Sequence, residues 1–235
     1  PNLAQIPSVH AEYGSECREQ WVVDPGYKLV GIDASGLELR MLAHYMEDEE
    51  YTKEVVDGDI HTKNQLAAGL DTRAKAKTFI YAFLYGAGPK KIGSITGTNG
   101  TVIIDKFMKN VPALAKLKEK IAVNLRNKGS LPGLDGRRLF IRSEHAALNT
   151  LLQGAGAVVM KKALVIFDKY IKLHELDAHF VANVHDEWQL EVKEEEAELV
   201  GQLGVKAIIE AGKALRLNCP LDGEYKVGDN WKQTH

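Results

Sequence analysis

Cysteine is scarce in this sequence: Cys17 and Cys219 are the only two in 235 residues, and no CxxC pair occurs. That scarcity argues against a cysteine-held zinc site and against a disulfide framework, so we expect a reducing compartment. An uninterrupted apolar run of about 18 residues is also missing, and the first residues lack the basic head and apolar stretch of a secretory leader. We therefore predict no membrane span and a cytoplasmic protein.

A strong net charge is absent too, because the formal charge is −2, but the charges are unevenly distributed. Residues 73–144 contain 15 Lys and Arg against 4 Asp and Glu, whereas acidic residues gather at 47–59 and 187–198. A section of that composition could bind the phosphates of a nucleic acid. A solvated basic surface explains the same pattern equally well, so charge alone leaves both interpretations open.

Repeats and low-complexity segments are absent, and the length allows one domain or two small ones. Apolar periodicity and turn residues predict an α+β protein, with helices around a small antiparallel sheet and an inserted, basic helical section. Residues 1–26 and about 93–100 look irregular. Helices are expected from residue 37 to the acidic residues at 47–50, and over about 61–69, 73–85, 101–108, 112–127, 144–172 and 194–215. Short strands are expected at 138–142, 180–184 and 188–192.

Two acidic positions stand out beside the expected strands. An apolar run carries the chain from residue 27 to Asp33, and small residues then lead into a helix. His185, Asp186 and Glu187 separate two strand-like runs, which predicts a tight hairpin with charge at its tip. If Asp186 faces Asp33 across the sheet, the pair suits Mg²⁺, which takes few carboxylates together with substrate phosphates, as in two-metal phosphoryl transfer. The alternative is an ordinary polar turn.

A second group of residues is spaced by four along the helix predicted at 73–85. Arg73, Lys77, Tyr81 and Tyr85 drift slowly around one face of that helix, because a turn takes 3.6 residues. The two cations could bind a triphosphate, and the two tyrosines offer flat, partly polar surfaces for a sugar or a base. A surface helix with half-buried aromatics is the alternative.

Three ordered motifs resemble those of family A DNA polymerases. DASGLELR at 33–40 resembles motif A, Arg73-x3-Lys77-x3-Tyr81-x3-Tyr85-Gly86 resembles the motif B fingers helix, and VHDE at 184–187 resembles motif C. Within that family the chain is most similar to the replicative polymerases of T-odd podophages, which share GLDGR at 133–137, HAALNTLLQ at 145–153 and the NWxxxH pattern at 230–235. The resemblance runs along the whole chain.

The resemblance implies a palm with a small antiparallel sheet and a helical fingers subdomain. The palm would take residues 1–43 and 150–235, and the fingers residues 44–149. The reaction implied is template-directed addition of dNTPs to a primer 3′-hydroxyl, assisted by two Mg²⁺, with Mn²⁺ as a possible substitute. The implied partners are primer-template DNA and dNTPs, and the implied setting is phage DNA replication in the cytoplasm of an infected bacterium.

Roles for individual residues follow from the same resemblance. Asp33, Asp186 and the Ala34 carbonyl would hold the metals, and Glu187 would flank them as a catalytic residue less certain to be a ligand. Lys77 would also protonate the leaving pyrophosphate. Arg73, Lys77 and His61 would bind the triphosphate. Tyr85 would stack near the nascent base pair, and Tyr81 would lie by the sugar 3′ position, where Tyr is associated with dideoxynucleotide acceptance. The residues implied to contact DNA are His185, Asn149 and Gln153, at the primer terminus and its minor groove, and Arg142.

Glu38 is expected to select the sugar. A carboxylate five residues after Asp33 would fill the space of a ribose 2′-hydroxyl and bond to Tyr85, so it would exclude ribonucleotides by clash and desolvation. The related single-subunit RNA polymerases lack this Glu, which favours DNA synthesis over that rival function. The alternative is that Glu38 is an ordinary solvent-exposed residue of the helix, with no role in selection.

The sequence departs from the family pattern in three places. His145 stands where the bacterial branch has arginine, although the phage branch shares the histidine. A family arginine expected just upstream of PNLxxIP is not part of this chain. No segment resembles the thumb or the proofreading exonuclease, so a thumb-bearing N-terminal region or separate subunit is an expected partner. The second rival function is accordingly a DNA-binding subunit, half of a divided polymerase.

Overall fold

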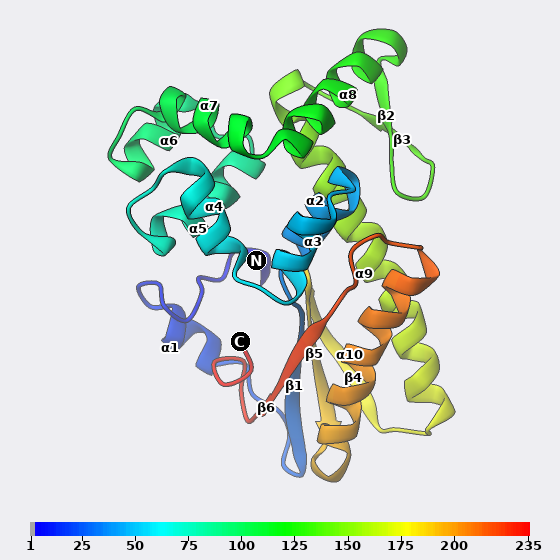
Figure 1. Ribbon diagram of the computed structural model, residues 1–235. Coiled ribbons are helices and arrows are strands. Elements are labelled where there is room, and N and C mark those ends of the chain that lie inside the picture. Colours follow the sequence, from blue (N-terminus) through cyan, green and yellow to red (C-terminus); the bar gives the residue numbers. More distant parts are fainter. Residues whose placement is uncertain (1–2) are drawn as a thin grey trace. The chain divides into compact units, whose positions relative to one another are not determined.

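The computed structural model describes residues 3–235, and the chain divides into two compact units (Figure 1). Pro1–Leu37 and Gly156–His235 belong to the first unit, and Glu38–Ala155 to the second. The sequence predicted that the first part of the palm ends at residue 43 and the fingers at residue 149. In the structure the corresponding boundaries fall at residues 37 and 155, each six residues away. The assignment of the units as palm and fingers stays a prediction.

An antiparallel sheet of four strands, in the order β4-β5-β1-β6, organises the first unit. Its strands are β1 (Tyr27–Ala34), β4 (Ala178–Val184), β5 (Glu187–Lys193) and β6 (Gly223–Gly228). The hairpin predicted from the sequence is β4–β5, and β1 lies between β5 and β6. The middle of β1 is buried on both faces, which explains why its sequence reads as a nearly continuous apolar run.

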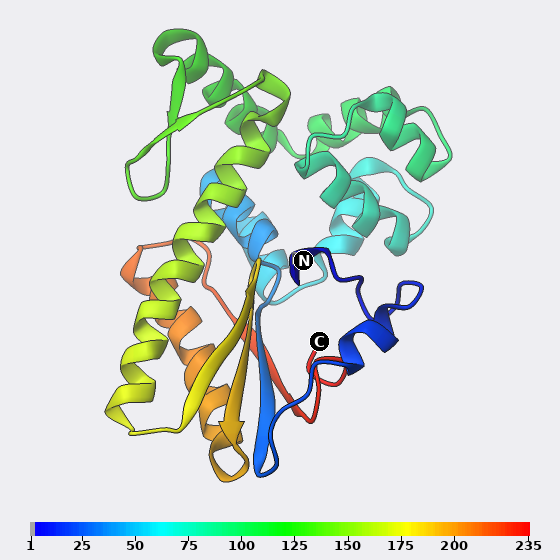
Figure 2. The same cartoon turned by 180° about the vertical axis from the view of Figure 1, so that it is seen from behind.

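One face of this sheet packs against α10 (Ala197–Ala214) and against the part of α9 (Ala147–Leu173) that belongs to the first unit; Figure 2 shows the arrangement from behind. Trp188 is fully buried there and stacks on Phe167 of α9, with ring centroids 5.5 Å apart and planes at 27°. A Cβ at Gly204 of α10 would lie 2.4 Å from Cδ1 of Ile32, so a larger residue there would have to displace the end of the Ile32 side chain.

The opposite face of the sheet is covered by segments from the two ends of the unit. Residues 230–235 lie against β1, and a Cβ at Gly31 would fall 2.3 Å from the Thr234 carbonyl oxygen. Val22 forms an isolated bridge with Asn230. The short helices η1 (Leu3–Gln5) and α1 (Gly14–Glu19) precede that bridge, so the prediction of irregular structure over residues 1–26 is wrong for this part; residues 1–2 lie outside the described residues.

The second unit is mainly helical. Phe79 and Phe83 of one helix meet Phe107 of another in a buried core, with ring centroids 5.2 and 5.8 Å apart. Its elements are the part of α2 (Leu37–Met46) after Leu37, α3 (Glu49–Val56), α4 (Ile60–Ala68), α5 (Arg73–Leu84), α6 (Pro89–Thr96), α7 (Gly100–Asn110), α8 (Pro112–Lys128), β2 (Ser130–Pro132), β3 (Arg138–Phe140), η2 (Glu144–Ala146) and the start of α9.

Local sequence signals explain the helix ends that matter for function. Asp59 precedes α4 and its side chain accepts from the amides of His61 and Thr62. Gly69 closes α4 in the left-handed conformation, with φ 69°. The side chain of Thr72 then accepts from the amide of Lys75 at 3.2 Å and caps the start of α5.

Besides η1 and α1, the sequence did not predict α3, α6, β2 or β6. The acidic residues at 47–50 do not simply end a helix, because Asp48 caps a new one, α3, by accepting from the Tyr51 amide at 2.8 Å. Within the region expected to be irregular, α6 forms after Pro89, which suits the first helical position. Strand β6 was also missed, since its sequence GEYKVG is short and glycine-flanked; it is held by pairing with β1. The helix expected at 194–215 begins with a short 3₁₀ turn, η3 (Glu194–Glu196).

Helix α9 is long and largely apolar, although polar residues interrupt its sequence. Residues 144–173 are long and apolar enough to cross a membrane by length and composition alone, with a mean hydropathy of 1.4 over the best window. That window is 44% buried inside the protein, and core helices of soluble proteins pass the same test. One side of α9 faces the core, where four of its residues are fully buried, namely Ala155, Val159, Ala163 and Phe167. We therefore interpret α9 as a core helix.

Candidate functional site

Two aspartates lie at one end of the sheet in the first unit. Asp33 is the penultimate residue of β1, and Asp186 lies in the two-residue turn between the paired residues Val184 and Glu187. The amide of Ala34 donates to the main-chain oxygen of Asp186 at 3.1 Å, so the two strand ends are in direct main-chain contact. Both aspartate side chains are half-buried. The residue directly opposite Asp33 in the sheet is Glu187, and Asp186 lies next to it in the turn. A shared metal site at Asp33 and Asp186 therefore stays a prediction.

The turn itself is strained at His185. This residue has φ 54°, in the left-handed region that side chains other than glycine rarely adopt. Such a conformation costs about 1–2 kcal/mol and persists only where the surroundings impose it. The side chain of His185 is exposed. A positive φ is what the tight two-residue turn of a hairpin commonly requires, and Asp186 is the next residue of that turn.

The donor set at this turn is suitable for a hard divalent cation. Asp33 and Asp186 offer carboxylate oxygens, and the main chain at Ala34 offers a carbonyl. Among the described residues 3–235, no group of three or more His, Cys, Asp or Glu side chains is placed to hold a metal. Mg²⁺ keeps several waters and commonly binds one or two carboxylates plus substrate phosphates. The residues therefore fit an ion completed by a phosphorylated substrate, and they do not form a closed protein cage.

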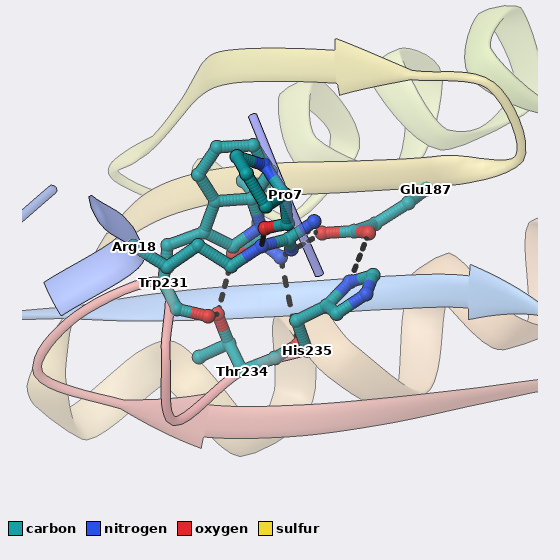
Figure 3. Close-up of polar contacts among 7 residues, drawn as sticks. Pro7, Arg18, Glu187, Trp231, Thr234 and His235 are labelled. Atoms are coloured by element: carbon teal, nitrogen blue, oxygen red, sulfur yellow. Dashed lines mark hydrogen bonds and ion pairs between the residues drawn. The ribbon is translucent and has the colours of Figure 1, made fainter. Parts of the chain in front are cut away.

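Glu187 differs from the two aspartates, because it is the first residue of β5 and is only 6% exposed. Its carboxylate accepts from Trp231 Nε1 at 2.8 Å and from His235 Nδ1 at 2.6 Å (Figure 3). It also accepts from Gln189 Nε2 at 2.5 Å. Burial raises the pKa of Glu187, but these hydrogen bonds outweigh burial and leave its pKa below the ordinary value. The sequence placed Glu187 in the turn as a catalytic residue; the structure places it in the strand, and a direct catalytic role stays a prediction.

In the second unit, α5 carries the predicted series of residues. Arg73 and Lys77 are exposed, Tyr81 is half-buried, and Tyr85 follows the last residue of the helix with 48% of its surface exposed. Arg73 donates from Nε to Asp59 Oδ2 at 2.8 Å. This ion pair raises the pKa of Arg73 and holds the pKa of Asp59 well below its usual range. A phosphate bound at Arg73 would compete with Asp59.

His61 belongs to the same group, through the start of α4. Its ring lies 6.1 Å from that of Tyr81, centroid to centroid, and its Nδ1 is buried without a hydrogen-bond partner. Burial lowers the pKa of His61, and the positive charges of Arg73 and Lys77 lower it further. His61, Arg73 and Lys77 are here called the basic cluster. Burial, and then the two neighbouring cations, favour the neutral form of His61.

We expect an anion at this cluster to reverse that effect. Negative charge near His61 favours the imidazolium form, so adding inorganic pyrophosphate without metal should raise the pKa of His61. The measurement is a pH titration of the His61 ring signals by NMR. Lys77→Met provides a matched variant: it removes one cation and should raise the pKa of His61 in the ligand-free protein. An unchanged titration of His61 with pyrophosphate would contradict an anion site at this cluster.

The contact predicted between Glu38 and Tyr85 is also present in the second unit. The Tyr85 hydroxyl donates to Glu38 Oε1 at 2.7 Å, although the two residues are 47 positions apart in the chain. Glu38 lies in the first turn of α2 and is half-buried. The bond fixes the carboxylate beside the aromatic ring.

The remaining predicted contacts come from the segment before and at the start of α9. Arg142 is exposed after β3, Asn149 is half-buried, and Gln153 is exposed one turn later on the same helix. Asn149 and Gln153 are four residues apart, so they share one helix face, as a groove contact would need. Their roles at DNA stay predictions.

Several residues of this site were not predicted. Asp59 belongs to the acidic stretch 47–59, and its position fourteen residues before Arg73 gives no local signal of an ion pair. Trp231 and His235 were noted only as part of a sequence pattern at the end of the chain, and no role was inferred for Gln189 or Arg18. The signal that could have found them is Glu187 itself, because a carboxylate entering a buried strand requires donors.

The first unit carries two aspartates at one end of its sheet, and the second unit carries a helix with a basic face. The chain belongs to DNA polymerase family A, whose family model matches residues 1–233. The DNA-directed DNA polymerases of Enterobacteria phage T3 and Escherichia phage T7 are each 43% identical to it, with 100% of this chain and 38% of each phage protein aligned. The chain thus spans about two fifths of the length of these relatives.

A solved structure gives the same result for the fold. The POL domain of Pol1 from M. smegmatis, in complex with DNA primer-template and dNTP, aligns with a TM-score of 0.88 at 26% sequence identity. The alignment covers 99% of this chain and 45% of that one. The predicted α+β polymerase fold is confirmed by this likeness.

Proposed function

We propose that this chain is the palm and fingers of a template-directed DNA polymerase, which adds dNTPs to a primer 3′-hydroxyl in phage DNA replication. The observation that carries the proposal is the main-chain contact between Ala34 and Asp186, which brings two aspartates to one end of the sheet. The phage relatives named DNA-directed DNA polymerases support it, as does the relative bound to primer-template and dNTP.

The chemistry proposed for the first unit is metal-assisted phosphoryl transfer. Two Mg²⁺ ions, when bound, would supply activation of the attacking 3′-oxygen and charge neutralisation at the leaving pyrophosphate. Asp33, Asp186 and the Ala34 carbonyl would hold them. Phosphoryl transfer asks for positioning and charge stabilisation more than for covalent chemistry from the protein, and half-buried carboxylates on a rigid strand and turn supply the positioning.

The basic cluster of the second unit is proposed to bind the triphosphate. Arg73 and Lys77 supply charge, and neutral His61 can donate one ring N–H to a phosphate oxygen without the cost of a third cation. Lys77 would return a proton to the leaving pyrophosphate. The tyrosines at 81 and 85 would pack against the sugar and the nascent base pair, and His185, Asn149, Gln153 and Arg142 would contact the DNA.

Primer extension by the purified chain tests the function. We expect dNTP-dependent and template-dependent elongation, with dNTPs strongly preferred to rNTPs. Because the chain spans only 38% of the phage relatives, we also propose that a thumb-bearing region, preceding this one or on a separate subunit, raises activity and processivity. Extension should therefore increase when the preceding part of the protein is supplied. Preferential use of rNTPs would indicate an RNA polymerase, and DNA binding without extension in either form would indicate a binding subunit.

A further inference from the structure

Glu187 is the central acceptor of a buried group of hydrogen bonds, on the face of the sheet opposite α10. Its direct partner across the sheet is Asp33, so the side chains of these two residues project from the same face. Glu187 nevertheless accepts from three side-chain donors, which belong to Gln189, Trp231 and His235. A carboxylate has about four acceptor positions, so these donors occupy most of its capacity.

The same network fastens residues 230–235, here called the tail segment, against β1. Oγ1 of Thr234 donates to Gln189 Oε1 at 2.8 Å, and the carbonyl oxygen of Thr234 lies only 2.3 Å from where a Cβ of Gly31 would be. Gly31 is two residues before Asp33 on the same face of β1. The tail segment therefore forms the surface that immediately adjoins Asp33, and the absence of a side chain at position 31 is what makes room for it.

A third segment, near the start of the chain, completes the network. The guanidinium of Arg18 lies 4.2 Å from the centre of the Trp231 ring, and its Nε donates to the carbonyl of Pro7 at 2.8 Å (Figure 3). The amide of Trp231 donates to the carbonyl of Trp21 at 3.1 Å. Trp231 is 2% exposed, so solvent cannot take the place of Glu187 as the hydrogen-bond acceptor of its indole N–H. Through its hydrogen bond to Trp231, Glu187 links β5 to the tail segment and to α1, which carries Arg18.

We propose that Trp231 and Glu187 form a positioning pair, which locks the tail segment beneath β1 and so fixes the main chain that presents Asp33 and Asp186. Glu187 acts through the tail segment, and metal ligation is left to the two aspartates. The mechanical link is short: Glu187 is adjacent to Asp186 in the chain and opposite Asp33 in the sheet, and the Ala34–Asp186 hydrogen bond ties the two strand ends. The catalytic part of this inference rests on the proposed function, whereas the locking of the tail segment does not.

Two substitutions separate positioning from metal ligation. Trp231→Phe keeps an aromatic ring and removes the indole N–H, and Glu187→Gln keeps the shape and removes the charge. We expect each to increase amide hydrogen exchange in the tail segment, measured without metal, DNA or nucleotide. In primer extension we expect each to lower kcat about tenfold with an unchanged Mg²⁺ concentration at half-maximal rate. The double variant should lose less than the sum of the two single effects, because both changes weaken the same Trp231–Glu187 hydrogen bond.

Glu191→Gln is the matched control, since Glu191 lies on the same sheet face as Glu187 and accepts only from the Asp24 amide among the hydrogen bonds described. It should leave exchange in the tail segment unchanged. A Mg²⁺ requirement raised more than tenfold in Glu187→Gln but not in Trp231→Phe would assign Glu187 to the metal and overturn the proposal. Unaltered exchange in both variants would overturn the locking. Failure of the wild-type protein to extend primers would instead overturn the proposed function, while the exchange experiment would still decide the locking.

Discussion

Replacing Asp186 by Asn is expected to reduce primer extension by about 10³-fold or more, with DNA binding largely intact. The amide keeps the size of the side chain but loses the charge that would hold a divalent cation. Loss of a metal's charge stabilisation removes several kcal/mol from the transition state, and each 1.36 kcal/mol is tenfold in rate. Asp33→Asn should have an effect of the same order, because both acids lie at the same strand ends. The measurement is single-turnover extension of a labelled primer.

The same variants are expected to fold normally. Neighbouring carboxylates repel one another in the absence of a cation, so removing one charge should leave the thermal unfolding midpoint unchanged or slightly higher in metal-free buffer. Asp168→Asn is a suitable control, since Asp168 forms an exposed ion pair with Lys172 on α9 away from the turn. It should extend primers at the wild-type rate. Surviving activity in Asp186→Asn or Asp33→Asn would remove the two-metal proposal.

Features encoded by neighbouring residues were predictable from the sequence. Thr72 and Gly69 mark helix ends because their chemistry acts on the amides and carbonyls beside them. The β4–β5 hairpin was predictable because two apolar runs flank a short charged stretch. The spacing of four between Arg73 and Lys77 required only the helix period. The fold class and the list of candidate residues were thus available from the chain itself together with the family resemblance.

Features that depend on distant segments were not predictable in the same way. Trp231 and Glu187 are 44 positions apart, and nothing near either residue indicates the other. The position of β6 beside β1 likewise follows from sheet order, which short glycine-flanked sequences do not specify. The ion pair of Arg73 with Asp59 depends on how α4 and α5 pack, so the sequence showed a cation available for phosphate but not the carboxylate with which phosphate would compete.

Replacing Glu38 by Ala is expected to raise the use of rNTPs relative to dNTPs by about tenfold to a hundredfold in kcat/KM. A ribose 2′-hydroxyl placed against the native carboxylate would meet both a filled volume and an acceptor already bonded to Tyr85. Leaving a buried polar group without a partner costs about 1–3 kcal/mol, which corresponds to that range of discrimination. Removing the carboxylate opens the space. The measurement is single-nucleotide incorporation with matched rNTP and dNTP.

Two further variants separate volume from hydrogen bonding in this selection. Glu38→Gln keeps the volume, so it should retain most of the discrimination, whereas Tyr85→Phe removes only the hydroxyl that donates to Glu38 at 2.7 Å. If the bond serves to hold the carboxylate in place, Tyr85→Phe should relax the selection less than Glu38→Ala but more than Glu38→Gln. Glu119→Ala, on the exposed face of α8, is the control and should change nothing. An unchanged rNTP/dNTP ratio in Glu38→Ala would show that the Glu38–Tyr85 pair serves the fold of the second unit and that sugar selection lies elsewhere.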